Sequence, residues 1–251
     1  MGASTGIGRS LAHHAIALGG QVCVAARREH HLIDLCQEAG GGTHLVGDVT
    51  DAASCRRIVD AAAEQLGGLD LVVYCAGGGV LAPIGESDAE RWASDYAVNV
   101  IGATQITRAT LPHLHADGLM AYLSSEITGE PRWGMSSYAA SKAALDASIR
   151  SWRLEHPDVR FTRVVMGATM PTDFAAGFDP EILATALDRW EAAGISPALM
   201  ATDDVGRHLA GVFALLLTHP IIDVPDITLD PRGEPWPTGP NPPAPQQQGE
   251  A

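Results

Sequence analysis

Gly2-Ala3-Ser4-Thr5-Gly6-Ile7-Gly8 forms a glycine-rich turn that leads into a helical pattern. The apolar residues of this pattern recur at helical spacing, and Gly19-Gly20 follows it at the C-cap position. Glycines in such a turn let the backbone approach a pyrophosphate, whose charge would face the N-terminus of the helix. The alternative interpretation is an ordinary glycine-rich loop, because three glycines alone are weak support.

The residues after this turn alternate between short apolar runs and helical patterns. We expect strands at 21–26, 44–49, 69–75, 119–123 and 160–165, and a last one at 221–224 or 227–229. This alternation predicts an α/β fold, a doubly wound parallel sheet of the Rossmann type, in one domain over residues 1–230. The apolar, alanine-rich stretch 174–201 is interpreted as a small helical lid. Residues 231–251 are rich in proline and glutamine and are predicted to be a disordered tail.

Composition excludes several classes of partner. The formal net charge of −14 argues against nucleic acid or an anionic membrane as the main partner. No apolar stretch predicts a membrane span, and the start does not resemble a signal peptide. The ten histidines are scattered, so no metal site is predicted. The four cysteines form no C-x-x-C pair, which favours a reduced cytoplasm.

Charged side chains lie at the ends of the first and second predicted strands. Arg27-Arg28 ends the first strand, at a position where an acid would accept the ribose 2′-OH of NAD. Two guanidiniums there instead favour a 2′-phosphate, although an ordinary solvated arginine pair is the alternative. Asp48 lies at the end of the next strand, where its carboxylate can reach an adenine amino group.

Tyr138 and Lys142 lie four residues apart within Ser136-Ser137-Tyr138-Ala139-Ala140-Ser141-Lys142. On a helix this spacing places both side chains on one face. A phenol beside an ammonium is biased toward its anion, so Tyr138 suits a general acid or base. A surface Tyr and Lys that share a helix are the alternative. Asn99 lies inside a helical pattern, which is unfavourable unless its amide is used.

The ordered set of motifs resembles the short-chain dehydrogenase/reductase family, of the single-domain type. The resemblance covers residues 1 to about 230. It rests on the following matches, in chain order: Gly2-x-x-x-Gly6-x-Gly8, Asp48-Val49, Ala76-Gly77, Asn99, Ser125 placed thirteen residues before Tyr138, and Tyr138-x-x-x-Lys142.

The resemblance implies a role for each matched residue. Tyr138 would be the general acid or base, Lys142 would lower its pKa and hold the nicotinamide ribose, and Ser125 would bond the substrate oxygen. Asn99 would support a water that leads protons to Lys142. The cofactor would contact Gly2, Ser4, Thr5, Gly6, Ile7, Gly8, Arg27, Arg28, Asp48, Val49, Ala76, Gly77, Asn99, Tyr138, Lys142, Gly167, Thr169 and Thr172.

Four departures from the family pattern stand out. The central first strand is missing, so we expect Met1 to be a misassigned start with the working protein beginning upstream. Tyr74-Cys75 replaces an Asn-Asn pair, and Met166 replaces a proline before Gly167. Glu126 directly follows Ser125, and its charge would discourage anionic substrates.

The leading expectation is an oxidoreductase that moves a hydride between NADP(H), with NAD(H) also possible, and a carbonyl or secondary alcohol. The apolar lid and nearby aromatic residues favour a hydrophobic small molecule, although core packing explains them as well. A catalytically silent nucleotide-binding sensor or scaffold, and a truncated non-functional fragment, are the alternatives. Relatives of this kind pair through the helix at 138–156, so a homodimer or homotetramer is expected.

Overall fold

Six parallel strands form two sheets in the computed structural model, which describes residues 1–231. The larger sheet has the order β3-β4-β5-β8, with bounds Leu69–Tyr74, Leu114–Leu123, Arg160–Met166 and Asp226–Leu229. The smaller pairs β1 (Cys23–Ala26) with β2 (Thr43–Val46). A third, very short pair joins β6 (Thr169–Met170) to β7 (Met200–Ala201). The predicted tail lies outside the described residues, except for Pro231.

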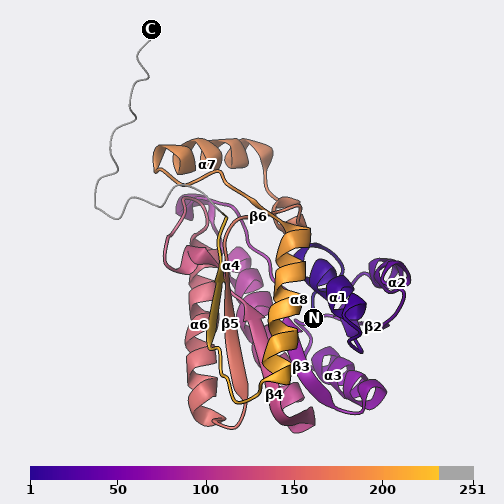
Figure 1. The fold of residues 1–251 in the computed structure, drawn as a ribbon. Helices are drawn as coiled ribbons and strands as arrows, with labels where there is room; N and C mark the ends of the chain where they lie inside the picture. Colours follow the sequence, from indigo (N-terminus) through magenta and orange to yellow (C-terminus); the bar gives the residue numbers. More distant parts are fainter. Residues whose placement is uncertain (232–251) are drawn as a thin grey trace.

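Helices cover both faces of the larger sheet (Figure 1). The elements are α1 (Gly6–Ala17), α2 (Glu29–Glu38), α3 (Ala52–Leu66), α4 (Ala89–Tyr96), α5 (Ala103–Thr110), α6 (Ser136–Glu155), α7 (Pro180–Ala192) and α8 (Thr202–Thr218). Side chains alternate along β4: Met120 and Tyr122 pack with α3, α5 and α6, while Leu119 and Ala121 pack with α1 and α8. This arrangement confirms the predicted doubly wound α/β class.

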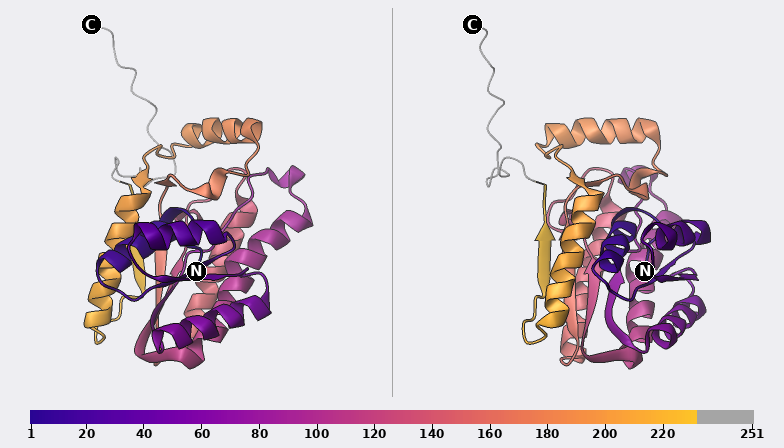
Figure 2. Two further views of the ribbon diagram at one scale, coloured as in Figure 1. Left: turned by 90° about the vertical axis from the view of Figure 1, so that its right-hand side faces the viewer. Right: turned by 45° about the vertical axis from the view of Figure 1, so that its right-hand side comes forward.

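The first residues of the chain lie between the two sheets. Gly2 N donates to Ala25 O at 2.8 Å, and Cys75 N donates to Met1 O at 2.9 Å. The Met1 amino group donates to Val73 O at 2.9 Å. Figure 2 shows the N-terminus in this position, beside β1 and β3. The expectation of a missing strand stays a prediction.

Most predicted strand positions are confirmed. Of the two positions expected for the last strand, 227–229 is confirmed, because Asp226–Leu229 pairs with β5. The Asp88 side chain accepts from Arg91 N and caps α4. The predicted lid contains α7, which lies across the carboxyl ends of the strands at the top of Figure 1. No helix within residues 1–231 has both the length and the apolar character that a bilayer span requires.

Candidate active site

The predicted site residues follow consecutive parallel strands, so they gather at one edge of the fold. Arg27 follows β1, Asp48 lies just after β2, Ala76 follows β3, Ser125 follows β4 and Gly167 follows β5. In parallel α/β sheets ligands bind outside the carboxyl ends of the strands. The contacts at this edge therefore decide whether the predicted residues come together in one site.

The glycine turn is tightly packed, and the N-terminus of α1 begins in it without a side-chain cap. A Cβ at Gly8 would lie 2.3 Å from Gly2 O, and one at Gly2 would lie 2.5 Å from Ala76 N. Gly6 begins α1 with φ +59°. Thr5 caps this helix without a side-chain hydrogen bond, and no acid lies in its first turn, which includes Ile7. Unsatisfied N–H groups there suit an anion, so the turn fits the pyrophosphate of a dinucleotide.

Arg28 links the glycine turn to a distant loop. Its Nη2 donates to Ser4 Oγ at 2.9 Å and to Thr5 Oγ1 at 3.2 Å. Its Nη1 lies 2.8 Å from Asp173 Oδ2, and this pairing holds the pKa of Asp173 below its usual range. Sequence reasoning missed Asp173, whose pairing with Arg28 depends on how two loops meet.

Arg27 is exposed and lies near the carboxylate after β2. Thr50 N and Thr50 Oγ1 both donate to Asp48 Oδ1, at 2.9 and 2.8 Å. The backbone bond from Thr50 is the main reason that the pKa of Asp48 is lowered, and Arg27 adds to it. Val49 is turned inward, since its carbonyl accepts from Cys55 Sγ at 3.3 Å.

Lys142 is buried one turn after Tyr138 on α6. Its side chain is almost fully enclosed, and Nζ donates to Leu123 O at 2.7 Å. Burial lowers the pKa of Lys142 to about 8. Nζ lies 5.8 Å from the centre of the Tyr138 ring, which confirms the expected shared face.

Tyr138 faces Ser125 in a desolvated setting. Burial raises the pKa of Tyr138 to about 12, and a hydrogen bond with Ser125 opposes this rise. The sequence predicted a phenol biased toward its anion by Lys142. In the structure desolvation outweighs that effect, so the phenol is neutral near pH 7.

Asn99 joins this group from a π-helical segment, Ala97–Gly102, between α4 and α5. Its Nδ2 donates to Gly78 O at 2.8 Å and to Ser141 Oγ at 2.9 Å, while Oδ1 accepts from Gly78 N at 3.2 Å. The Asn99 amide thus makes the hydrogen bonds that its position inside a helix predicted. Ser141, which sequence reasoning missed, lies within the motif that contains Tyr138.

Gly77 brings the backbone after β3 against the same side chains. A Cβ there would lie 3.3 Å from both Asn99 Oδ1 and Lys142 Nζ. A Cβ at the next-but-one residue, Gly79, would lie 2.9 Å from Tyr138. The glycines at 77 and 79 therefore leave room for the side chains of Asn99, Tyr138 and Lys142.

The loop after β5 completes the edge. Gly167 N donates to Leu229 O at 2.8 Å, and Thr169 Oγ1 donates to Gly167 O at 3.0 Å. A Cβ at Gly6 would lie 3.4 Å from Thr172 Cγ2, so this loop and the glycine turn flank one space. The predicted site residues thus gather at this edge, while the side chains of Ile7, Val49 and Ala76 pack against the core clusters.

An apolar cluster covers Tyr138 beneath α7. It contains Leu81, Ile127, Met135, Ala186, Trp133, Phe178, Ile182, Leu183 and Trp190. The Phe174 ring lies 4.9 Å from that of Tyr138. Asp95, also missed by sequence reasoning, is buried nearby and accepts from Ser137 Oγ at 2.6 Å.

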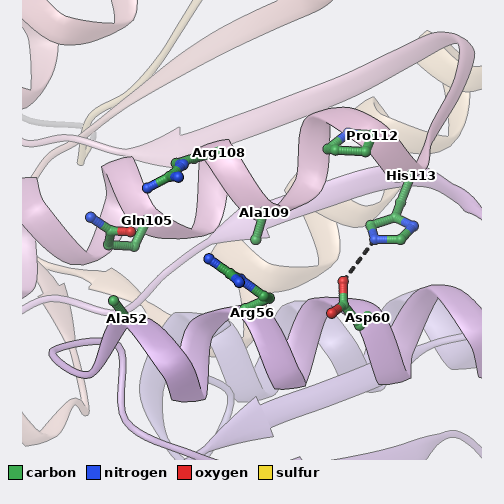
Figure 3. A pocket seen from close by; sticks show the side chains of 8 residues that line it. All are labelled: Ala52, Arg56, Asp60, Gln105, Arg108, Ala109, Pro112 and His113. Atoms are coloured by element: carbon green, nitrogen blue, oxygen red, sulfur yellow. Dashed lines mark hydrogen bonds and ion pairs between the residues drawn. The ribbon is translucent and has the colours of Figure 1, made fainter.

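A separate cavity of about 160 Å³ lies between α3 and α5 (Figure 3). Arg56 and Arg108 line it, and a 2.8 Å bond joins His113 Nε2 to Asp60 Oδ1. None of the predicted site residues lines this cavity.

Comparisons with known proteins show the family of the chain. Residues 1–182 match the short chain dehydrogenase family. An uncharacterized oxidoreductase of Mycobacterium tuberculosis is 34% identical over 242 residues, covering 93% of this chain and 90% of that protein. The 11-beta-hydroxysteroid dehydrogenase A of Sesamum indicum is 34% identical over 174 residues. That match covers 66% of this chain and only half, 50%, of the sesame protein.

Solved structures share the fold over nearly the whole chain. An alcohol dehydrogenase from the archaeon Thermococcus sibiricus, complexed with 5-hydroxy-NADP, has a TM-score of 0.78 at 24% identity, covering 91% of this chain and 93% of that one. A short chain dehydrogenase from Burkholderia cenocepacia J2315, in complex with NADP, has a TM-score of 0.77 at 25% identity, covering 91% and 94%. The chain therefore belongs to the short chain dehydrogenase family, whose members are NAD(P)-dependent oxidoreductases.

Proposed function

We propose that this protein reduces a carbonyl group to an alcohol, and catalyses the reverse oxidation, with Tyr138 as the general acid or base. The observation that carries the proposal is the group gathered at the strand ends, in which Ser125 lies beside Tyr138 and Lys142 Nζ lies 5.8 Å from the centre of the Tyr138 ring. Asn99 ties this group to the backbone after β3.

Each side chain has a defined task in the reduction. Ser125 donates to the substrate oxygen and stabilises charge that develops there. Tyr138, neutral near pH 7, gives its phenolic proton to that oxygen as the adjacent carbon accepts a hydride. Lys142, with a pKa near 8, returns a proton toward Tyr138. Alcohol oxidation runs the same proton transfers in reverse.

The bound nicotinamide cofactor would supply or accept the hydride. The glycine turn would hold its pyrophosphate at the start of α1, and Asp48 would face its adenine. We propose that NADP(H) is preferred over NAD(H), because Arg27 is exposed beside Arg28 after β1 and would bond a 2′-phosphate.

The apolar cluster beneath α7 supports a substrate with a hydrophobic part. A homodimer or homotetramer belongs to the same proposal, since Ala143 and Ala147 are exposed on α6 and allow close helix contact. Size-exclusion chromatography with light scattering measures that state. The four free cysteines suit a reducing compartment, so we propose the cytoplasm.

The test is Tyr138→Phe, which removes the phenolic proton and keeps the ring. The variant should bind NADPH like the unchanged protein and should lose carbonyl reduction across a panel of aldehydes and ketones. Unchanged turnover in the variant would refute the role of Tyr138. NADPH binding without turnover by either protein would favour the alternative of a nucleotide-binding sensor.

A further inference from the structure

A charged pair, Glu126 and Arg132, lies next to the apolar cluster that covers Tyr138. Glu126 directly follows Ser125, and Arg132 precedes Tyr138 in the loop before α6. Arg132 Nη2 donates to Glu126 Oε1, and the two side chains are only 19% and 23% exposed. Arg132 lies over the Trp190 ring, and Trp190 packs in the apolar cluster that includes Tyr138, so the pair lies close to the reacting position.

Arg132 has a donor that the described residues leave unused. Its Nε is shielded from solvent and has no hydrogen-bond partner within residues 1–231. A buried donor without an acceptor is unfavourable. Glu126 accepts only at Nη2, so Nε remains free to donate. Nε can therefore bond one oxygen of a further carboxylate in a charge-assisted hydrogen bond.

Aromatic side chains surround the Arg132 guanidinium. Its carbon lies 5.8 Å from the Trp190 ring centre, and Trp190 Nε1 donates to Trp133 O at 3.0 Å. Arg189 lies 4.9 Å from the Trp133 ring in the reciprocal arrangement. A ligand that reaches Nε would therefore lie among the aromatic rings of the apolar cluster that also includes Tyr138.

We propose that Arg132 determines substrate specificity by binding a carboxylate on the substrate, which is therefore an oxo acid or hydroxy acid with an apolar part. This inference rests on the proposed function and names its substrate class. The carboxylate satisfies Nε, and the carbonyl reaches Ser125 and Tyr138. Because Glu126 is paired with Arg132, its charge does not repel such a substrate as the sequence alone suggested.

The test uses one aromatic oxo acid, 4-oxo-4-phenylbutanoate, and its methyl ester. These probes share the ketone and the ring, and differ in the charge that Arg132 would bind. Each is titrated into the protein saturated with NADP⁺, which cannot reduce the ketone, and tryptophan fluorescence reports binding beside Trp190. The acid should bind about tenfold or more tightly than the ester, and Arg132→Gln should remove that difference.

Two further variants keep the result interpretable. Glu126→Gln combined with Arg132→Gln removes both charges, so no unpaired carboxylate is left if the single variant fails to fold. Arg189→Gln is the matched control, because it removes an arginine from the same aromatic cluster and should keep the preference for the acid.

Equal binding of acid and ester would overturn the proposal, as would an acid preference that survives in both Arg132 variants. Absence of acid binding at millimolar concentration would also overturn it. Nucleotide binding and reduction of the aldehyde and ketone panel are measured first, so a failure of the proposed function is seen there, before either probe is added.

Discussion

Replacing Asn99 by Ala tests whether its amide holds the backbone segment after β3 in place. Asn99 is fully buried and makes three hydrogen bonds, two with Gly78 backbone groups and one with Ser141 Oγ. At about 1 kcal/mol for each bond, Asn99→Ala should lower the free energy of unfolding by about 3 kcal/mol. For a chain of this size, that loss lowers the melting temperature by about 6–12 °C.

Ser141→Ala and Ser148→Ala provide a graded comparison on α6. Ser141 Oγ accepts from Asn99 and donates to Tyr138 O at 2.8 Å, so its removal should cost about 1 kcal/mol. Ser148 Oγ bonds only Ala144 O within its own helix, and its removal should change stability by less than about 0.5 kcal/mol.

The assay is thermal unfolding followed by circular dichroism, with carbonyl reduction measured in parallel. Without the two hydrogen bonds to Gly78, the backbone beside Lys142 shifts. A misplacement of about 1 Å can lower turnover by about 10²-fold. The reasoning is refuted if Asn99→Ala melts within 2 °C of the unchanged protein, as measured against the roughly 6–12 °C expected. It is also refuted if Ser141→Ala and Ser148→Ala lower stability equally.

Three further predictions concern the cofactor turn, the phosphate site and the proton path. Gly8→Ala places a Cβ 2.3 Å from Gly2 O, so it should destabilise the protein by about 1–3 kcal/mol in urea unfolding and weaken NADPH binding; unchanged values would contradict the packing of this turn. Arg27→Ala should weaken NADPH binding about tenfold and leave NADH binding unchanged in fluorescence titrations, whereas an equal loss for both cofactors would argue against a 2′-phosphate contact. Carbonyl reduction should fall as pH rises through about 8, because Lys142 then loses its proton, and Lys142→Met should be slower with no inflection there. An inflection that survives in Lys142→Met would assign it to another group.

Much of the fold and site could be predicted because their signals are local. Strands such as 160–165 are short apolar runs, and parallel strands place the residues that follow them at one edge. The spacing of Tyr138 and Lys142 likewise fixes a shared helical face. The identity of Asn99, inside a helix, already indicated that its amide is used.

Other features depend on contacts between distant loops, for which the sequence has no periodic signal. The Arg28–Asp173 pair requires the loop after β1 to meet the loop after β6. The unused Nε of Arg132 depends on α7 lying over it. The pKa of Tyr138 was predicted in the wrong direction, since a spacing argument includes the charge of Lys142 and omits desolvation.

The most direct test of the central assignment, a nicotinamide nucleotide at the carboxyl ends of the strands, is a titration of this chain with NADPH and then NADH, followed by nicotinamide fluorescence. Saturable binding of NADPH, about tenfold or more tightly than NADH, is the predicted result, because in the proposed site the start of α1 would face the pyrophosphate and Arg27 would face the 2′-phosphate. Equal affinity would contradict selection of the 2′-phosphate. No binding of either nucleotide would contradict the assignment of this edge as the cofactor site.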